Sequence, residues 1–192
     1  MLKHVLARLK AFRDETRGSL SVEAVFAFPM LLWALTATYT FFDAYKVQNT
    51  AYRANYTISD MLSRQTDPVD ADFLNGLYRV FRYIARVDAE SSWIRVSVVQ
   101  CMDKCADETN RVLQWDWSKG VGGARDLDSN DLDFYRDVIP LMAKGDRLIL
   151  VETSVDYQPP FAQALVSFSP EKLVSHVVTR PRFAPQLKWS NG

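Results

Sequence analysis

The chain has few of the residues on which catalytic and metal sites usually depend. It contains two histidines, His4 and His176, and two cysteines, Cys101 and Cys105. Without a dimer, no histidine can join both cysteines in a zinc site. No G-x-S-x-G, H-E-x-x-H or glycine-rich phosphate-binding motif occurs. Residue types alone do not exclude a Ser-His-Asp triad, but the sequence predicts neither an enzyme nor a cofactor.

Net charge and glycine are also scarce. The 23 basic and 23 acidic residues give a formal net charge of zero, so nothing favours nucleic-acid binding. Seven glycines and 12% aromatic residues argue against disorder. The chain has no internal repeat and no low-complexity tract. The part beyond residue 43, about 150 residues, is enough for one domain with its own core.

A long apolar run stands near the N-terminus. No charged residue occurs from Ala24 to Phe42, a length close to the roughly 20 residues that a helix needs to cross a bilayer. Pro29 is tolerated in a membrane helix, and threonine can bond to its own helix backbone. The alternatives are a buried core helix and a cleaved signal peptide, whose apolar core is usually shorter. We expect a transmembrane helix over residues 19–43.

Basic residues precede this run. The first 18 residues carry Lys3, Arg8, Lys10, Arg13 and Arg17 against two acidic residues. The positive-inside rule therefore predicts a cytoplasmic leader over residues 1–18, with an amphipathic helix over 1–17 at the membrane surface. The rest of the chain would lie across the membrane. In that oxidising compartment we expect Cys101 and Cys105 to form a disulfide.

Helical spacing continues beyond the apolar run. We expect one long helix from Ser19 to about Arg64, in which residues 44–66 are an amphipathic continuation. Its inward side would carry Ala44, Val47, Ala51, Ala54, Ile58, Met61 and Leu62. A second helix is expected over residues 71–86, after a proline break and a helix-start signal. Its apolar side would carry Phe73, Leu77, Val80, Phe81 and Ile84.

Alternating residues then predict four strands, over residues 91–102, 111–120, 146–158 and 172–183. The first two would form a hairpin around CMDKCADETN, and Pro181 places the last strand at an edge. A short helix is expected over residues 131–145, and a loosely held tail after Pro185. The layout is α+β, with helices packed on one face of a roughly four-stranded antiparallel sheet, and residues 67–192 form the extracytoplasmic domain.

Three tryptophans fall on the hairpin strands. Trp115 and Trp117 alternate with Gln114 and Asp116, so we expect both on one face of their strand. With Trp93, they are expected to fill the space between sheet and helix. An exposed sugar-binding or partner-binding patch is the alternative.

An acidic stretch partly resembles a calcium loop. Asp126, Asp128 and Asn130 fall at alternating positions of an EF-hand loop, with Asp137 at its twelfth place. However, Asp131 stands where the sharp turn needs glycine, and a short aspartate replaces the bidentate glutamate. We favour a polar loop in which Asp131 or Asn130 caps the following helix, and expect no metal.

Glu23 is an unusual residue at the start of an apolar helix. Cleavage after Gly18 would make Ser19 the new N-terminus, with its ammonium one helical turn from the Glu23 carboxylate. Opposite charges there offset each other's desolvation, and a carboxylate in the first turn suits the helix dipole. The arrangement resembles the class III signal of type IV prepilins and pseudopilins.

The stretch RGSLSVEAVFAFPMLL is similar to the start of TadE/TadG-like proteins of the Tad (Flp) pilus system. That family has a basic leader, an RG pair, a VE pair and an apolar run with an early proline. The matching residues here are Arg17, Gly18, Val22, Glu23 and Pro29. Ala24 departs from the pattern, because many members have an aromatic residue after the glutamate. The late VDYQPPF…VVTRPRF loosely resembles the family's final strands.

The resemblance implies a pilin-like fold and a minor pilin or pseudopilin of the bacterial inner membrane, structural rather than enzymatic. Its partners would be the lipid bilayer, other pilins, the Tad assembly machinery and a prepilin peptidase, with neither nucleic acid nor a small-molecule substrate. Glu23 would set the axial register against an N-terminal ammonium. The main alternative is an uncleaved, membrane-anchored periplasmic binding or scaffold protein of a secretion or envelope complex. An anchored hydrolase is a third, without a motif.

Overall fold

The computed structural model describes residue 10 and residues 18–161 and 169–190. The chain divides into two compact units. The first comprises Met1–Asp43 and Pro159–Phe168, and the second Ala44–Gln158 and Ser169–Gly192. The helix expected over residues 1–17 lies outside the described residues.

Helix α2 (Gly18–Ser63) confirms the long helix expected from the sequence. Pro29 lies inside it without ending it. In its C-terminal half four of the expected apolar residues are buried: Ala51, Ala54, Ile58 and Leu62. Met61 is exposed, contrary to expectation, because it lies just beyond the edge of the stripe that these four residues form on the helix surface.

Helix α3 (Ala71–Ala85) begins and ends with local signals. The Asp70 side chain accepts a hydrogen bond from the Phe73 backbone N–H at 2.8 Å, as an N-cap does. Arg86 ends the helix in the left-handed conformation, with φ of 58°. The buried side is Leu74, Leu77, Tyr78, Phe81 and Ala85. Val80 was expected there but is exposed, and Leu74 and Tyr78 complete the stripe instead.

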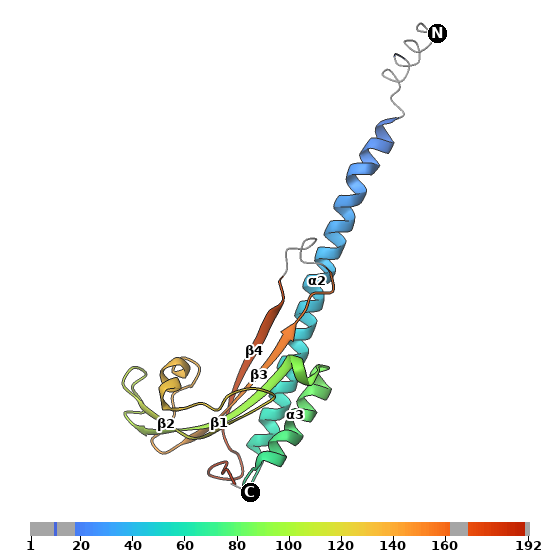
Figure 1. Ribbon diagram of the computed structural model, residues 1–192. Coiled ribbons are helices and arrows are strands. Elements are labelled where there is room, and N and C mark those ends of the chain that lie inside the picture. The colour runs from blue at the N-terminus through green and yellow to red at the C-terminus, as the bar shows by residue number, and fades with distance from the viewer. Residues whose placement is uncertain (1–9, 11–17, 162–168, 191–192) are drawn as a thin grey trace. The chain divides into compact units, whose positions relative to one another are not determined.

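The sheet has the four antiparallel strands that the alternation predicted. They are β1 (Ser92–Asp103), β2 (Val112–Val121), β3 (Arg147–Tyr157) and β4 (Glu171–Thr179). The spatial order is β2-β1-β3-β4, so β4 is an edge strand, as Pro181 indicated. Figure 1 shows β1 and β2 as a hairpin, with β3 and β4 beyond β1. In the part of the chain that the structure describes, two α-helices and one antiparallel sheet make the fold α+β.

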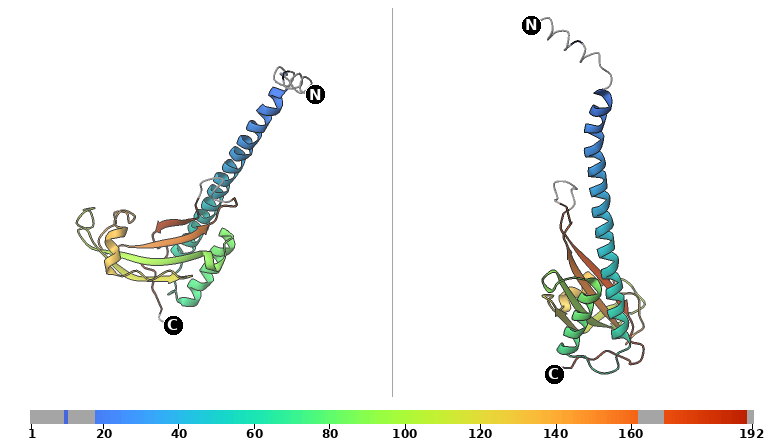
Figure 2. Two further views of the ribbon diagram at one scale, coloured as in Figure 1. Left: turned by 45° about the horizontal axis from the view of Figure 1, so that its top comes forward. Right: turned by 90° about the vertical axis from the view of Figure 1, so that its right-hand side faces the viewer.

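Both helices pack on one face of the sheet, as expected. The core there joins apolar residues of α3 and of the C-terminal half of α2 to Val96, Val98 and Val151 of the central strands. Figure 2 shows this part of α2 alongside the sheet. Asn55 of α2 is fully buried, and its side-chain amide donates to the Ser175 hydroxyl at 2.8 Å and the Ser175 carbonyl at 3.1 Å. These bonds attach α2 to the edge strand β4.

The opposite face of the sheet is covered by a short 3₁₀ helix, η2 (Ser129–Tyr135), and the turn after it. The longer helix expected over residues 131–145 is therefore wrong. The physical reason is Arg111, whose buried guanidinium binds the carbonyl oxygens of Arg136, Ile139 and Pro140. Carbonyl oxygens that accept hydrogen bonds from Arg111 do not accept the backbone hydrogen bonds that a longer α-helix would need. In addition, Pro140 has no backbone N–H to donate to the preceding turn of such a helix.

A bulge separates the two tryptophans of β2. Val98 pairs with Trp117 and Val99 with Trp115, so Asp116 is the extra residue. A bulge of one residue turns the next side chain to the other face. Trp117 packs against the core under the helices, whereas Trp115 packs against Tyr135 on the opposite face. The expectation of one shared face is wrong.

The C-terminal tail is attached, contrary to expectation. Leu187 is buried, and its carbonyl accepts a hydrogen bond from the Trp117 indole at 2.8 Å. Val69 and Trp189 form an isolated parallel bridge, with the Val69 N–H donating to the Lys188 carbonyl at 2.9 Å. Buried apolar contacts and backbone pairing together oppose the entropy that frays chain ends.

Candidate functional site

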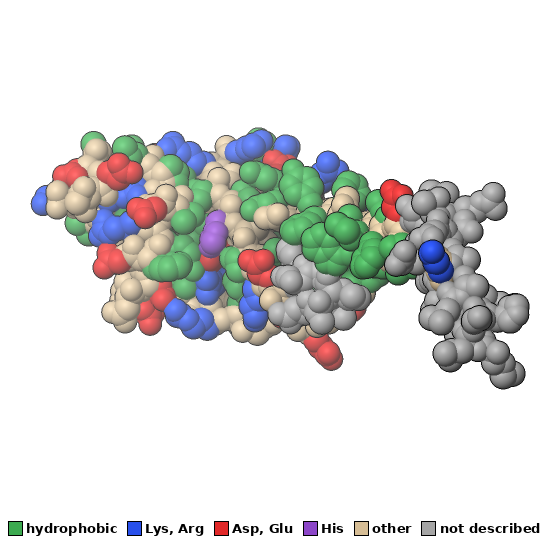
Figure 3. Space-filling model, turned by 90° about the horizontal axis from the view of Figure 1, so that it is seen from above, with side chains coloured by type: hydrophobic (Ala, Val, Ile, Leu, Met, Phe, Trp, Pro, Cys, Tyr) green, Lys and Arg blue, Asp and Glu red, His purple; other side chains and the backbone are tan. Residues whose placement is uncertain are grey.

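The N-terminal half of α2 is long and apolar enough to cross a membrane. Within the described residues one helix meets this condition, Ser21–Ser63, with a mean hydropathy of 1.6 over its most apolar window. Only 6% of that window is buried, which argues against the core helix of a soluble protein. Figure 3 shows hydrophobic side chains gathered over this part of α2. They include Val25, Phe26, Phe28, Met30, Leu31, Trp33 and Leu35.

The hydroxyl groups of this segment bond to their own helix. Thr36 donates to the Leu32 carbonyl at 3.0 Å, and Thr38 donates to the Ala34 carbonyl at 2.8 Å. Thr40 donates to the Thr36 carbonyl at 2.9 Å. Each side chain thus hides its donor from an apolar environment, as expected from the sequence. The three threonines of the run therefore add little to the cost of placing it in lipid.

The expected processing residues lie in the first two turns of α2. Gly18 is its first residue, Ser19 follows, and Glu23 is exposed. Ser19 and Glu23 are four residues, about one helical turn, apart in α2. Apart from Lys10 and Gly18, the leader lies outside the described residues. A carboxylate therefore stands one turn beyond the position where cleavage would create an ammonium.

A cluster of interacting polar side chains lies on the sheet face opposite the helices. Glu152 of β3 is 1% exposed, and its two oxygens bind different partners. Arg95 Nε donates to Oε2 at 2.6 Å, and the Tyr135 hydroxyl donates to Oε1 at 2.8 Å. His176 Nε2, on edge strand β4, lies 3.1 Å from Oε1. Arg95 Nη2 closes the network by donating to the Tyr135 hydroxyl at 2.6 Å.

This cluster has a defined electrostatic character. Burial alone would raise the pKa of Glu152, but hydrogen bonds from His176 and Arg95, and the Arg95 charge, hold that pKa below its ordinary value. Burial, then the hydrogen bond to Glu152, raises the pKa of Tyr135 far above its ordinary value. Glu152 is thus an anion and Tyr135 a neutral donor at neutral pH. The arrangement stabilises a buried ion pair but offers no activated nucleophile.

Sequence reasoning missed this cluster, although a signal was available. Arg95 and Glu152 each interrupt an apolar strand, in WIRVSV and LILVETSV. Charged residues are almost never fully buried unless they are paired, so two opposite charges in two central strands indicate a buried pair. Strand order was also needed, and β1 and β3 prove to be neighbours with Arg95 directly opposite Glu152.

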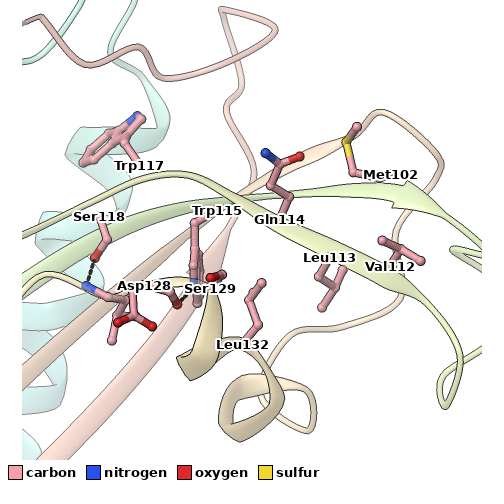
Figure 4. A pocket seen from close by; sticks show the side chains of 11 residues that line it. Met102, Val112, Leu113, Gln114, Trp115, Trp117, Ser118, Asp128, Ser129 and Leu132 are labelled. Carbon is pink, nitrogen blue, oxygen red and sulfur yellow. Dashed lines mark hydrogen bonds between the residues drawn. The ribbon is translucent and has the colours of Figure 1, made fainter.

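A groove of about 540 Å³ opens between β2 and η2. Figure 4 shows Leu113, Trp115 and Leu132 lining it, with Asp128 and Ser129 at one side. The Trp115 indole donates to the Asp128 carbonyl at 3.0 Å, which fixes the ring against the start of η2. Its volume lies within the range of small-ligand sites. Some of its polar groups already have partners, since the Ser118 hydroxyl accepts a hydrogen bond from the Leu127 N–H at 3.0 Å.

Two residues of the calcium-loop pattern, Asp126 and Asp128, have other partners. Asp126 pairs with Lys119 at 2.6 Å and accepts from the Gly120 N–H at 2.9 Å. Asp128 caps η2 in a capping box with Asp131, while Asp131 also pairs with Arg125. The N-cap is therefore Asp128, two residues before Asn130. The exposed Asp137 lies beyond the end of η2. Among the described side chains, no three His, Cys, Asp or Glu groups are placed to hold a metal ion.

Cys101 and Cys105 form the expected disulfide. Cys101 is fully buried at the end of β1, and Cys105 lies in the turn that follows. Lys104, between them, has a left-handed backbone with φ of 52°. The bond therefore closes a very short loop at the tip of the β1–β2 hairpin.

Reduction of this disulfide is expected to lower the free energy of unfolding by only about 2 to 3 kcal/mol, because closing so short a loop removes little chain entropy. The measurement is denaturant unfolding of the same chain with and without reductant, which leaves every side chain in place. Thiol labelling of the unreduced protein should fail at both cysteines. Rapid labelling of both, or loss of the fold on reduction, would contradict this expectation.

No family model matches the chain, and neither a curated protein nor a solved structure matches it.

Proposed function

We propose that this chain is a membrane-anchored, pseudopilin-like component of a Tad-type pilus assembly system, cleaved after Gly18 by a prepilin peptidase. The observation that carries the proposal is the spacing of Gly18 and Glu23 at the head of the apolar half of α2. A basic leader precedes it in the sequence, and an α+β domain follows the helix. The leader and the apolar helix are both needed for the proposal, since a glycine with a glutamate five residues later also occurs by chance.

The proposed mechanism is assembly rather than catalysis. The apolar half of α2 holds the chain in the inner membrane, with the basic leader in the cytoplasm and the α+β domain outside. Cleavage after Gly18 exposes the Ser19 ammonium, which pairs with a Glu23 carboxylate of its own or of a neighbouring chain. A charge at membrane depth is costly, by about 3 kcal/mol on insertion scales, unless it is paired. The pair therefore favours one axial register between adjacent helices.

Replacement of Gly18 by leucine tests this proposal. A bulky side chain at this position would keep the peptidase from approaching the backbone, so Gly18→Leu is expected to leave the full-length chain in the membrane. Gly76→Leu is the matched control, because Gly76 is exposed in α3 and a Cβ added there would meet no neighbouring group within 4 Å. Mass spectrometry of the N-terminus reads the outcome. If the wild-type protein in its host still carries Met1 to Gly18, the proposed cleavage is wrong.

An uncleaved, membrane-anchored binding or scaffold protein is the second candidate. The groove between β2 and η2 favours it, because Trp115 offers an aromatic surface on β2, the edge strand at the other end of the sheet from β4. The same N-terminal mass measurement separates the two candidates. An intact leader together with normal membrane retention would support the scaffold.

A further inference from the structure

The connection between β3 and β4 belongs to the same compact unit as the apolar helix. Pro159–Phe168 group with Met1–Asp43, while both strands belong to the other unit. Within this connection, residues 159–161 are described. The feature is unexpected, because a hairpin connection normally belongs to the sheet whose strands it joins.

A ring contact joins the connection to α2. The Phe161 and Tyr39 rings lie 5.7 Å apart between centroids, with their planes at 74°. Edge-to-face pairs of this kind add favourable energy beyond the area that they bury. Thr40, the next residue of α2, is 1% exposed, whereas Phe42 is 70% exposed. Near Tyr39, helix α2 is therefore covered on one side and exposed on another.

The depth of this contact in the membrane follows from helix geometry. Tyr39 lies three residues before Phe42, where the uncharged run ends. With a rise of about 1.5 Å per residue, Tyr39 is only about 4 to 5 Å inside that end. In a spanning helix this depth is the boundary between hydrocarbon and headgroups, where aromatic side chains are enriched. Phe161, in contact with Tyr39, shares that depth.

The composition around Phe161 suits the same environment. No charged residue occurs from Tyr157 to Pro170, and charges return at Asp156 on one side and at Glu171 and Lys172 on the other. Asp156 and Lys172 form an ion pair at 3.8 Å, at the strand ends. Pro159 and Pro160 carry no backbone N–H, so this part of the chain has fewer donors to dehydrate at a lipid surface.

We propose that Pro159, Pro160 and Phe161 form a second membrane contact, in which they dip into the outer-leaflet interface beside α2. The proposal rests on the membrane-spanning role of α2 given above. The contact adds aromatic and proline surface to the anchor at the point where the chain leaves the bilayer. Withdrawal of α2 from the membrane would have to remove this contact as well.

Site-specific fluorescence in lipid vesicles tests the contact. The full chain is reconstituted, unreduced, in phosphatidylcholine vesicles after labelling single introduced cysteines with a polarity-sensitive dye. Phe161→Cys and the exposed Pro160→Cys report on the contact, and Leu35→Cys reports on the span. Phe134→Cys is the control, since Phe134 is an aromatic residue of η2 that is largely exposed. The quencher is a lipid with a spin label near the top of its acyl chains.

We expect the labels at 160 and 161 to be blue-shifted and to lose several-fold more fluorescence to the quencher than the label at 134. Quenching at 35 without quenching at 160 and 161 would overturn the contact and leave the span in place. No quenching at 35 would overturn the span, and the proposed contact with it. Disulfide cross-linking between copies at 161 without lipid quenching would show that protein covers this surface, and would also overturn the proposal.

Discussion

Replacement of Glu152 by alanine is expected to lower the free energy of unfolding by about 3 to 5 kcal/mol, because it leaves the Arg95 charge buried without its partner. Arg95 and Glu152 are both buried, and Tyr135 would lose its acceptor in the same step. Denaturant unfolding of the full chain in detergent, followed by near-ultraviolet circular dichroism, measures the loss. The effect should be among the largest for any single polar residue of the domain.

Asp133→Ala is the matched control. Asp133 also pairs with an arginine, Arg136, at 2.9 Å, but the aspartate is exposed. Exposed pairs contribute only about 0.2 to 1 kcal/mol, so this variant should change stability little. Replacing both partners, in Arg95→Met with Glu152→Leu, should cost much less than the sum of the single changes, because no unpaired charge remains. Additive losses would contradict the assigned coupling.

The same cluster predicts how stability depends on pH. The pKa of Glu152 is lower in the folded chain than its ordinary value of 4.5, so the unfolded chain binds this proton more readily. The stabilisation is therefore fully present above about pH 4.5 and is lost as the pH falls through the lower folded value. The free energy of unfolding of the wild type should fall more steeply on acidification than that of Glu152→Gln, which has no proton to take up.

The second large effect is expected at Glu23. Glutamine keeps the shape and hydrogen-bonding capacity of Glu23 but removes its charge, so Glu23→Gln should still be processed, at least in part. Pili should nevertheless be lost, because the Ser19 ammonium would have no partner at membrane depth, where an unpaired charge costs about 3 kcal/mol by insertion scales. An immunoblot for the mature form, beside a count of surface pili in the same strain, measures both steps.

Asp60→Asn is the control for this change. Asp60 lies on the same helix and is half-buried, in ion pairs with Arg64 at 2.9 Å and Arg182 at 3.5 Å, so the same loss of charge should leave processing and piliation intact. Normal piliation with Glu23→Gln would show that the charge has no role in assembly. Complete loss of cleavage would instead assign Glu23 to recognition by the peptidase.

Local sequence patterns determined most of the secondary structure of this chain. The uncharged run and the spacing after it predicted α2 almost to its last residue, because helix periodicity and the absence of breakers act within a few residues. Four strands followed from alternation, and the disulfide followed from two close cysteines. The Gly18 and Glu23 spacing, on which the proposed function depends, is also read directly from the sequence.

Contacts between distant segments decided those parts of the structure that local patterns did not predict. A guanidinium from Arg111 holds the carbonyls that a helix over residues 131–145 would have used, and this pairing spans more than 20 residues. The bulge at Asp116 exists only in register with β1, and the tail is held by Val69 and Trp117. Arg95 and Glu152 are visible in the sequence as charges in apolar strands, but only the order of the strands makes them a pair. Backbone propensity is a local property, whereas burial, pairing and register depend on which segments the fold brings together.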